Sequence, residues 1–152
     1  MPTRPVPPGV EFVVVRHAEK RSDDPRDPLL TDAGLARAQR LAVSLAAEPL
    51  AAVYATSYRR TQQTAAPSAA AHGLPVTTYD AKQEAKQLAA TLKHRHASGT
   101  VLIVGHSNTV PGIAAALCDC VVAPIGDSEF DRRLHVRIGG DGKATLLDTR
   151  MP

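Results

Sequence analysis

Two unbroken apolar runs constrain the fold of this chain more than any other feature of its sequence. They are "FVVV" at 12–15 and "VLIV" at 101–104, and both are rich in β-branched residues. A strand with one face in water alternates apolar and polar residues, whereas a central strand of a parallel sheet is covered on both faces and does not alternate. The two runs therefore predict central strands of an α/β protein.

Alanine-rich amphipathic stretches separate the apolar runs along the chain. This alternation of strand and helix patterns indicates βαβ units and a mostly parallel sheet. The expected strands cover 11–15, 50–55, 74–79 and 100–105, and the expected helices cover about 32–47, 58–72, 81–96 and 109–117.

The last third of the sequence has a different pattern. Apolar stretches at 132–138 and 144–149 flank "GGDGK", whose Gly-Gly and Asp-Gly pairs are typical of a hairpin turn. We expect these strands to close one edge of the sheet in antiparallel fashion. The fold class is therefore α/β, a three-layer α/β/α sandwich with a mostly parallel central sheet and an antiparallel C-terminal edge hairpin.

The length of 152 residues predicts one domain over 1–152, with an irregular segment at 1–9. Cys118 and Cys120 have no cysteine or histidine partner nearby at zinc-ligand spacing, which favours free thiols. No apolar run is long enough for a membrane span or a signal peptide, so we expect a cytoplasmic protein with no membrane partner. A targeting segment removed from the chain would leave no trace.

The charges do not favour a nucleic-acid partner. The chain has 18 Lys and Arg against 15 Asp and Glu, a net charge of +3, and its basic residues form no stripe. It has only three Tyr and two Phe, with no Trp, so rings on which bases could stack are few. We expect no nucleic-acid partner.

Polar residues of one chemical type follow three of the expected strands. Arg16-His17 ends the first strand, Arg59-Arg60 comes shortly after the second, and His106 follows the fourth. Ligands of open α/β sheets bind at the carboxyl ends of the strands, where these side chains would gather. Two guanidiniums can bind phosphate oxygens in bidentate fashion, and nearby positive charge keeps a histidine neutral and nucleophilic. The set suits phosphoryl transfer without a metal or other cofactor.

Four ordered blocks carry a resemblance to a known family. "RHAEK" at 16–20, "LLTDAG" at 29–34, "YRRTQQTAA" at 58–66 and "VLIVGHSN" at 101–108 resemble the histidine phosphatase superfamily, which is phosphoglycerate-mutase-like. The resemblance implies that His17 is the nucleophile, which forms a phosphohistidine. It also implies that Arg16 and Arg60 clamp the phosphate and that His106 stabilises it. Arg60 is preferred to Arg59 because "RTQQTA" matches the R-x-x-Q-T-A pattern of the family.

The sequence departs from the family at two places. Ala18 stands where the family has glycine, which keeps the residue small. Many members also carry a general-acid Glu in an insertion after the third strand, and this chain has no such insertion. Asp80 is the best substitute and Glu84 the second, although Asp80 is equally well explained as a helix N-cap. In a third alternative the chain has no general acid. The small phosphohistidine phosphatases are of this kind, because their phosphoramidate leaving group depends less on acid catalysis.

These observations favour a metal-independent phosphatase that hydrolyses phosphomonoesters or phosphohistidine on a phosphorylated small molecule or phosphoprotein. The chain has little material for a lid, which disfavours phosphoglycerate-mutase-type phosphoryl transfer. A non-catalytic phosphate-binding module stays open as an alternative. A metal site made of His17, Glu19 and His106 is disfavoured, because the chain has no H-E-x-x-H motif and the arginines would repel a cation.

Overall fold

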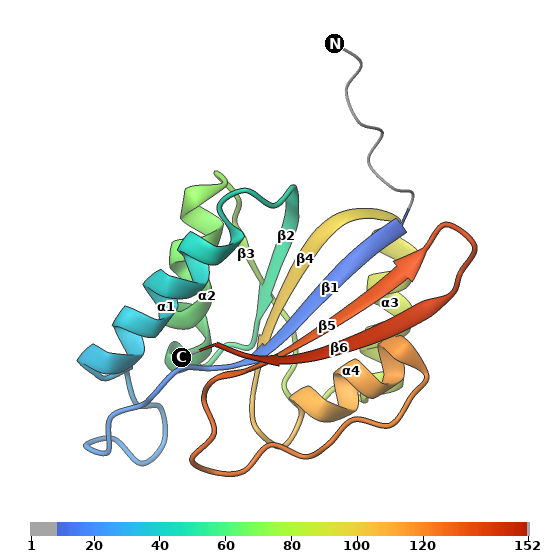
Figure 1. Ribbon diagram of the computed structural model, residues 1–152. Coiled ribbons are helices and arrows are strands. Elements are labelled where there is room, and N and C mark those ends of the chain that lie inside the picture. The colour runs from blue at the N-terminus through green and yellow to red at the C-terminus, as the bar shows by residue number, and fades with distance from the viewer. Residues whose placement is uncertain (1–8, 152) are drawn as a thin grey trace.

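The computed structural model describes residues 9–151, in which strands and helices alternate before a C-terminal pair of strands (Figure 1). Residues 1–8 of the expected irregular segment lie outside the described residues, and Gly9 begins the first strand. The elements are β1 (Gly9–Arg16), α1 (Asp32–Leu45), β2 (Leu50–Ala55), α2 (Arg59–Ala71), β3 (Val76–Thr78), α3 (Ala85–Arg95), β4 (Ser98–Gly105), α4 (Val110–Cys118), β5 (Arg132–Gly139) and β6 (Ala144–Arg150).

The strands form one six-stranded sheet in the order β3-β2-β4-β1-β5-β6. The β1–β4, β2–β4 and β2–β3 pairs are parallel, whereas β5 pairs with β1 and β6 in antiparallel fashion. The predicted fold class and the antiparallel C-terminal edge are therefore confirmed. The two strands that carry the unbroken apolar runs, β1 and β4, lie side by side in the middle of the sheet.

Helices cover both faces of the sheet, α1 and α2 on one and α3 and α4 on the other (Figure 1). Alternate residues of a single run serve the two cores: in β1, Val13 and Val15 pack toward α1 and α2, while Phe12 and Val14 pack toward α3 and α4. The runs contain no polar residue because the side chains on both faces of the strand are buried. No helix within residues 9–151 is long and apolar enough to cross a membrane.

The "LLTDAG" block fixes α1 against the segment that leaves β1. The Thr31 hydroxyl caps the helix by accepting from the Gly34 amide at 3.0 Å, and the Thr31 amide donates to the Glu19 carbonyl at 2.9 Å. A Cβ on Gly34 would lie 2.2 Å from that same carbonyl oxygen. Only glycine therefore permits this approach of helix and backbone.

The region after β3 differs from the expectation. β3 spans only Val76–Thr78, since it is an edge strand that pairs with β2 over three residues. The carboxylate of Asp80 accepts from the Lys82 amide at 2.9 Å and holds a turn there, which delays the start of α3 to Ala85. Asp80 therefore caps a turn and not the helix. Glu84, expected one turn into α3, is its N-cap residue.

The expectation of free thiols is wrong, because Cys118 and Cys120 form a disulfide. Cys118 ends α4, and Asp119 after it adopts the left-handed conformation with φ of 50°. This sharp reversal brings the two Cα atoms to 5.2 Å, within the range that a disulfide requires. Zinc-ligand spacing in the sequence could not reveal this local geometry.

Gly34 and Gly112 occupy equivalent places in the first turns of α1 and α4 and provide a matched pair of variants. We expect Gly34→Ala to lower the free energy of unfolding by about 1–3 kcal/mol, since the new methyl group would clash with backbone. Gly112→Ala, whose Cβ would meet Ala85 at 3.8 Å, should be neutral or stabilising by up to about 1 kcal/mol. Urea denaturation measures both. Equal effects would contradict the proposed close approach.

Candidate active site

The register between β1 and β4 brings two histidines together. Arg16 at the end of β1 pairs with Gly105 at the end of β4, and the His17 amide donates to the Gly105 carbonyl at 2.9 Å. The rings of His17 and His106 then lie edge to face, with centroids 5.5 Å apart. Both side chains are buried, with only 3% and 8% of their surface exposed.

The hydrogen bonds of His17 define its tautomer. Its Nδ1 lies 2.7 Å from the Ala18 carbonyl oxygen, which can only accept, so we infer that Nδ1 carries the proton. The lone pair is then on Nε2. The Ala18 amide donates to the Thr64 hydroxyl at 3.0 Å, which ties this segment to α2. Ala18 itself is fully buried in a small cluster with Leu30 and Ala38.

The hydrogen bonds of His106 define the opposite tautomer. Its Nδ1 lies 3.4 Å from Nη2 of Arg60, and a guanidinium can only donate, so Nδ1 accepts. Nε2 then donates to the Thr56 hydroxyl at 2.9 Å. Thr56 lies 2.7 Å from the hydroxyl of Thr61, which in turn donates to the Tyr58 carbonyl at 2.8 Å. This series of hydrogen bonds, the hydroxyl relay, ends at a main-chain carbonyl and holds the His106 ring in place.

Both histidines are neutral at pH 7. Burial, with help from the charges of Arg16, Arg60 and the other histidine, lowers the pKa of His17 to about 3, although the bond to Ala18 opposes this shift. Burial, followed by the charges of Arg60 and Arg16, lowers the pKa of His106 to about 4. Nε2 of His17 is therefore available as a nucleophile.

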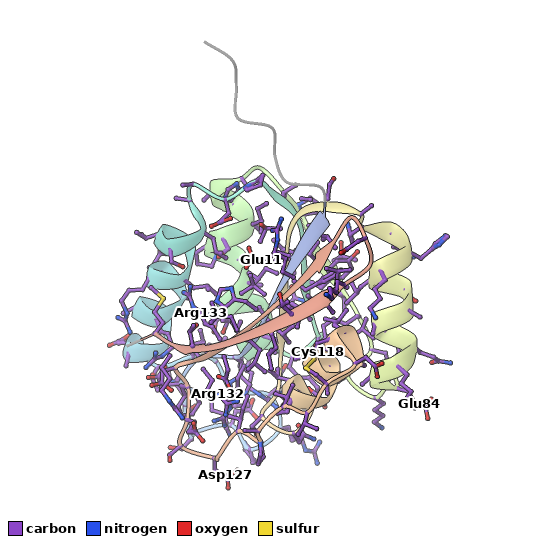
Figure 2. The ribbon with its side chains drawn as sticks, turned by 45° about the vertical axis from the view of Figure 1, so that its right-hand side comes forward. Glu11, Glu84, Cys118, Asp127, Arg132 and Arg133 are labelled. Atoms are coloured by element: carbon purple, nitrogen blue, oxygen red, sulfur yellow. A yellow bond between two sulfur atoms is a disulfide. The ribbon has the colours of Figure 1, made fainter. Side chains whose placement is uncertain are left out.

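Arg16 is held by the loop between α4 and β5. Its Nη1 donates to three carbonyl oxygens, and its ζ carbon lies 4.0 Å from the ring centre of Phe130. The acceptors are those of Gly126 at 3.3 Å, Asp127 at 2.8 Å and Glu129 at 2.9 Å. Figure 1 shows this loop in orange below the carboxyl end of β1, and in Figure 2 the Asp127 side chain points away from the protein. Nε of Arg16 is buried and has no hydrogen-bond partner within residues 9–151.

A second arginine anchors the same loop to the sheet. Arg132, labelled in Figure 2, is buried at the start of β5 and binds both carboxylate oxygens of Asp148 at 2.9 and 2.8 Å. Its Nη1 also donates to the Pro124 carbonyl at 2.9 Å, and its Nη2 to the Ala123 carbonyl at 3.1 Å. Arg16 and Arg132 therefore hold the loop through main-chain carbonyls between Ala123 and Glu129.

Arg60 and Arg59 point to different places. Arg60 contacts His106 and stacks on the Tyr58 ring at 4.6 Å. Its buried Nε has no hydrogen-bond partner in the part of the chain that the structure describes. Arg59 instead donates to the Asp27 carbonyl at 2.7 Å and to Asp24 at 3.3 Å, so it fastens the loop at 22–28. The structure thus brings Arg60, and not Arg59, to the histidines.

The two candidate acids differ in position. Asp80 lines a hollow of about 590 Å³ together with Tyr58, whose ring meets the His106 ring at 5.1 Å. Glu84 does not line this hollow, and its exposed side chain points outward at the end of α3 in Figure 2. Asp80 is therefore the candidate that lines the same hollow as Tyr58, the residue in contact with His106.

The alternative metal site lacks a free third ligand. Both oxygens of Glu19 accept from Arg37, at 2.8 and 3.0 Å. In the part of the chain that the structure describes, no three His, Cys, Asp or Glu side chains are grouped so that they could hold a metal ion. His17 and His106 are therefore not joined by Glu19 in a ligand set.

Phe130 and the hydroxyl relay were not found from the sequence. Phe130 lies in a loop without periodic pattern, while Thr56 precedes the "YRRTQQTAA" block and could have been suspected from that position alone. The N-cap of α4 is Thr109, whose hydroxyl accepts from the His106 amide at 3.1 Å.

Comparison with known proteins gives a match to one family model and a shared fold. The family model of the histidine phosphatase superfamily (branch 1) matches residues 12–86. The protein histidine phosphatase SixA complexed with tungstate is 19% identical with a TM-score of 0.72, over 92% of this chain and 96% of that one.

Two further solved structures are similar over nearly their whole length. The phosphoserine phosphatase of Entamoeba histolytica, in complex with 3-phosphoglyceric acid, is 13% identical with a TM-score of 0.71, over 94% of this chain and 98% of that one. A mycobacterial glucosyl-3-phosphoglycerate phosphatase is 14% identical with a TM-score of 0.74, over 95% and 100%. At these identities the likeness establishes the fold. No curated protein gives a significant match.

The two buried histidines make stability depend on pH. In the unfolded chain each protonates near its ordinary pKa of about 6.5, whereas in the folded protein the pKa values are about 3 and about 4. The unfolded state therefore binds more protons below pH 6.5, and folding stability falls as pH drops from 6.5 toward 4. The expected slope is about 1.4 kcal/mol per pH unit for each histidine.

Urea denaturation across this pH range tests the dependence. The double variant of His17→Asn and His106→Asn should lose most of the slope. His94→Asn, on the exposed last turn of α3, is the control and should keep it. The same slope in the wild type and the double variant would contradict the attribution of the pH dependence to His17 and His106.

Proposed function

We propose that this chain is a phosphatase of the histidine phosphatase superfamily, whose family model matches residues 12–86, and that it hydrolyses phosphomonoesters or phosphohistidine without a metal, through a covalent phosphohistidine at His17. The observation that carries this proposal is the neutral His17 ring, whose Nδ1 is bonded to the Ala18 carbonyl and whose Nε2 holds a lone pair beside two arginines. The one continuous sheet of the described residues is consistent with the proposed single domain.

The chemistry needs two displacements at phosphorus. In the first, the Nε2 lone pair forms the N–P bond while the bond from phosphorus to the leaving group breaks and its electron pair departs with that group. The imidazole then carries positive charge, which the bond from Nδ1–H to the Ala18 carbonyl stabilises. In the second, water attacks phosphorus and His17 departs with its electron pair restored, which releases inorganic phosphate and a proton.

The unpartnered guanidinium atoms support a phosphate clamp. Buried donors without partners are costly, and Nε of both Arg16 and Arg60 is such a donor. Phosphate oxygens would satisfy both and share the charge that spreads over them in the transition state. A bound dianion also favours the protonated form of His106, whose Nδ1 could then donate to the phosphoryl group. The tungstate in the SixA structure, a tetrahedral oxyanion, is in keeping with such a clamp.

Hydrolysis is favoured over mutase-type transfer. Only six residues, 79–84, connect β3 to α3, so this connection cannot form a lid that retains a small diphosphate intermediate. The hollow beside Tyr58 and Asp80 offers room for part of a larger substrate. A phosphorylated small molecule or a phosphoprotein is therefore the proposed substrate.

His17→Ala should abolish hydrolysis of an activated aryl phosphate, because the lone pair of the other buried histidine, His106, accepts from Arg60 and cannot replace that of His17. The wild type, quenched during turnover with labelled substrate, should carry an acid-labile and base-stable phosphoryl group that the variant lacks. Chelator should leave wild-type activity unchanged. Activity in the variant, or its loss on chelation, would refute the mechanism, and tight phosphate binding without any turnover would identify a non-catalytic module.

Asp80→Asn tests the general acid. If Asp80 protonates the leaving group, the variant should lose about 10²-fold or more in kcat toward alkyl phosphates and little toward aryl phosphates or phosphoramidates, whose leaving groups need less help. Glu84→Gln is the matched control and should leave both activities unchanged. Asp80 is not the acid if Asp80→Asn has the same effect on all three substrate classes.

A further inference from the structure

Two of the five aromatic rings of the chain lie outside the hydrophobic core, and both are at the proposed phosphate site. They are Tyr58 and Phe130, each half-buried. A chain so poor in aromatic residues places these two beside the histidines and not in its core. The other three rings, which are buried, are those of Phe12, Tyr54 and Tyr79.

Phe130 lies under the guanidinium of Arg16. The ζ carbon of Arg16 is 4.0 Å from the ring centre, and the Phe130 ring is 6.2 Å from that of His17. Every hydrogen bond of this guanidinium runs from Nη1 to the loop carbonyls. Its plane is therefore fixed by a ring on one face and by carbonyls along one edge, and Nε stays without a partner.

Tyr58 has the same relation to the second arginine. The ζ carbon of Arg60 is 4.6 Å from its ring centre, and the ring also meets that of His106 edge to face at 5.1 Å. The hydrogen bond of this guanidinium goes from Nη2 to His106, and Nε is again buried and unpartnered. Arg16 and Arg60 thus share one arrangement although their rings come from segments 72 residues apart in the sequence.

Stacking suits a side chain that must bind an anion. A ring attracts a guanidinium through its π face and consumes none of its N–H groups, so the in-plane donors stay available for oxygens. A carboxylate partner would compete with phosphate for those donors and would neutralise the charge. Neither Arg16 nor Arg60 has a hydrogen bond to a carboxylate among the described residues.

We propose that Phe130 and Tyr58 are positioning residues, which orient Arg16 and Arg60 for phosphate by stacking on their guanidinium planes. This inference rests on the proposed phosphate clamp. The loop between α4 and β5 is then part of the site, because it supplies both the ring and the carbonyls that hold Arg16.

Calorimetric titration with tungstate, an oxyanion that requires no turnover, tests the inference. Tyr58→Leu and Phe130→Leu should each weaken tungstate binding by between about 2- and 30-fold, the range that a cation–π contact of this kind provides. Tyr58→Phe and Phe130→Tyr keep the ring and should bind within about twofold of the wild type. Urea midpoints check folding, and Phe130→Met replaces Phe130→Leu if the latter does not fold.

A double-mutant cycle separates positioning from a merely structural role. In an Arg60→Met background, Tyr58→Leu should cause no further loss of affinity, because the ring then has no guanidinium to orient. In an Arg59→Met background the full loss should persist, since Arg59 binds Asp24 and Asp27 instead.

Three results would overturn the inference. They are wild-type affinity in both leucine variants, failure of the ring-keeping variants to bind normally, and an equal loss from Tyr58→Leu with and without Arg60. If the wild type itself does not bind tungstate, the proposed clamp fails, and this inference fails with it.

Discussion

The parallel pairing of β1 with β4 is the interaction on which the rest of the site depends. It aligns Arg16 with Gly105, so that the residues that follow, His17 and His106, emerge at the same level of the sheet. The main-chain bond from His17 to Gly105 extends the ladder one residue beyond β1. Because side chains alternate between the faces of a strand, a slip of one residue would exchange the two cores and separate the two rings.

The other residues of the site come from helices and loops that pack against the β1–β4 strand pair. The first turn of α2 carries Arg60 toward His106, while Thr64 one turn later accepts from the Ala18 amide. One helix therefore fixes both the second arginine and the segment that bears the nucleophile. Gly34 and Thr31 fix the same segment from the side of α1, and Glu19 is held there by Arg37.

Local patterns were sufficient to predict most of the fold and four members of the candidate site. The apolar runs identify the central strands, and Arg16, His17 and His106 follow from their positions at strand ends, because parallel strands end at the same edge. Position alone leaves Arg59 and Arg60 open, and the choice of Arg60 rests on the resemblance of "RTQQTA" to the family pattern. The roles of these residues stay predictions.

Features that depend on distant contacts or on competing local bonds could not be predicted. Phe130 contacts Arg16 although the two are 114 residues apart in the sequence. It lies in a loop, and a loop has no hydrophobic periodicity from which such a contact could be predicted. The start of α3 was placed too early because the turn bonded by Asp80 competes with helix formation. The disulfide depends on the left-handed conformation of Asp119, which residue spacing does not encode.

The manner in which Arg16 holds its loop has an evolutionary consequence. Its three acceptors are main-chain carbonyls, which every amino acid possesses, so the grip on Gly126, Asp127 and Glu129 does not depend on the identity of their side chains. Two side chains of the loop are exceptions, because the Phe130 ring stacks on the guanidinium and the Glu129 carboxylate accepts from the Gly126 amide. Exposed positions such as Asp127 and Ser128 can therefore change, and with them the surface that the loop presents, without loss of the main-chain acceptors of Arg16.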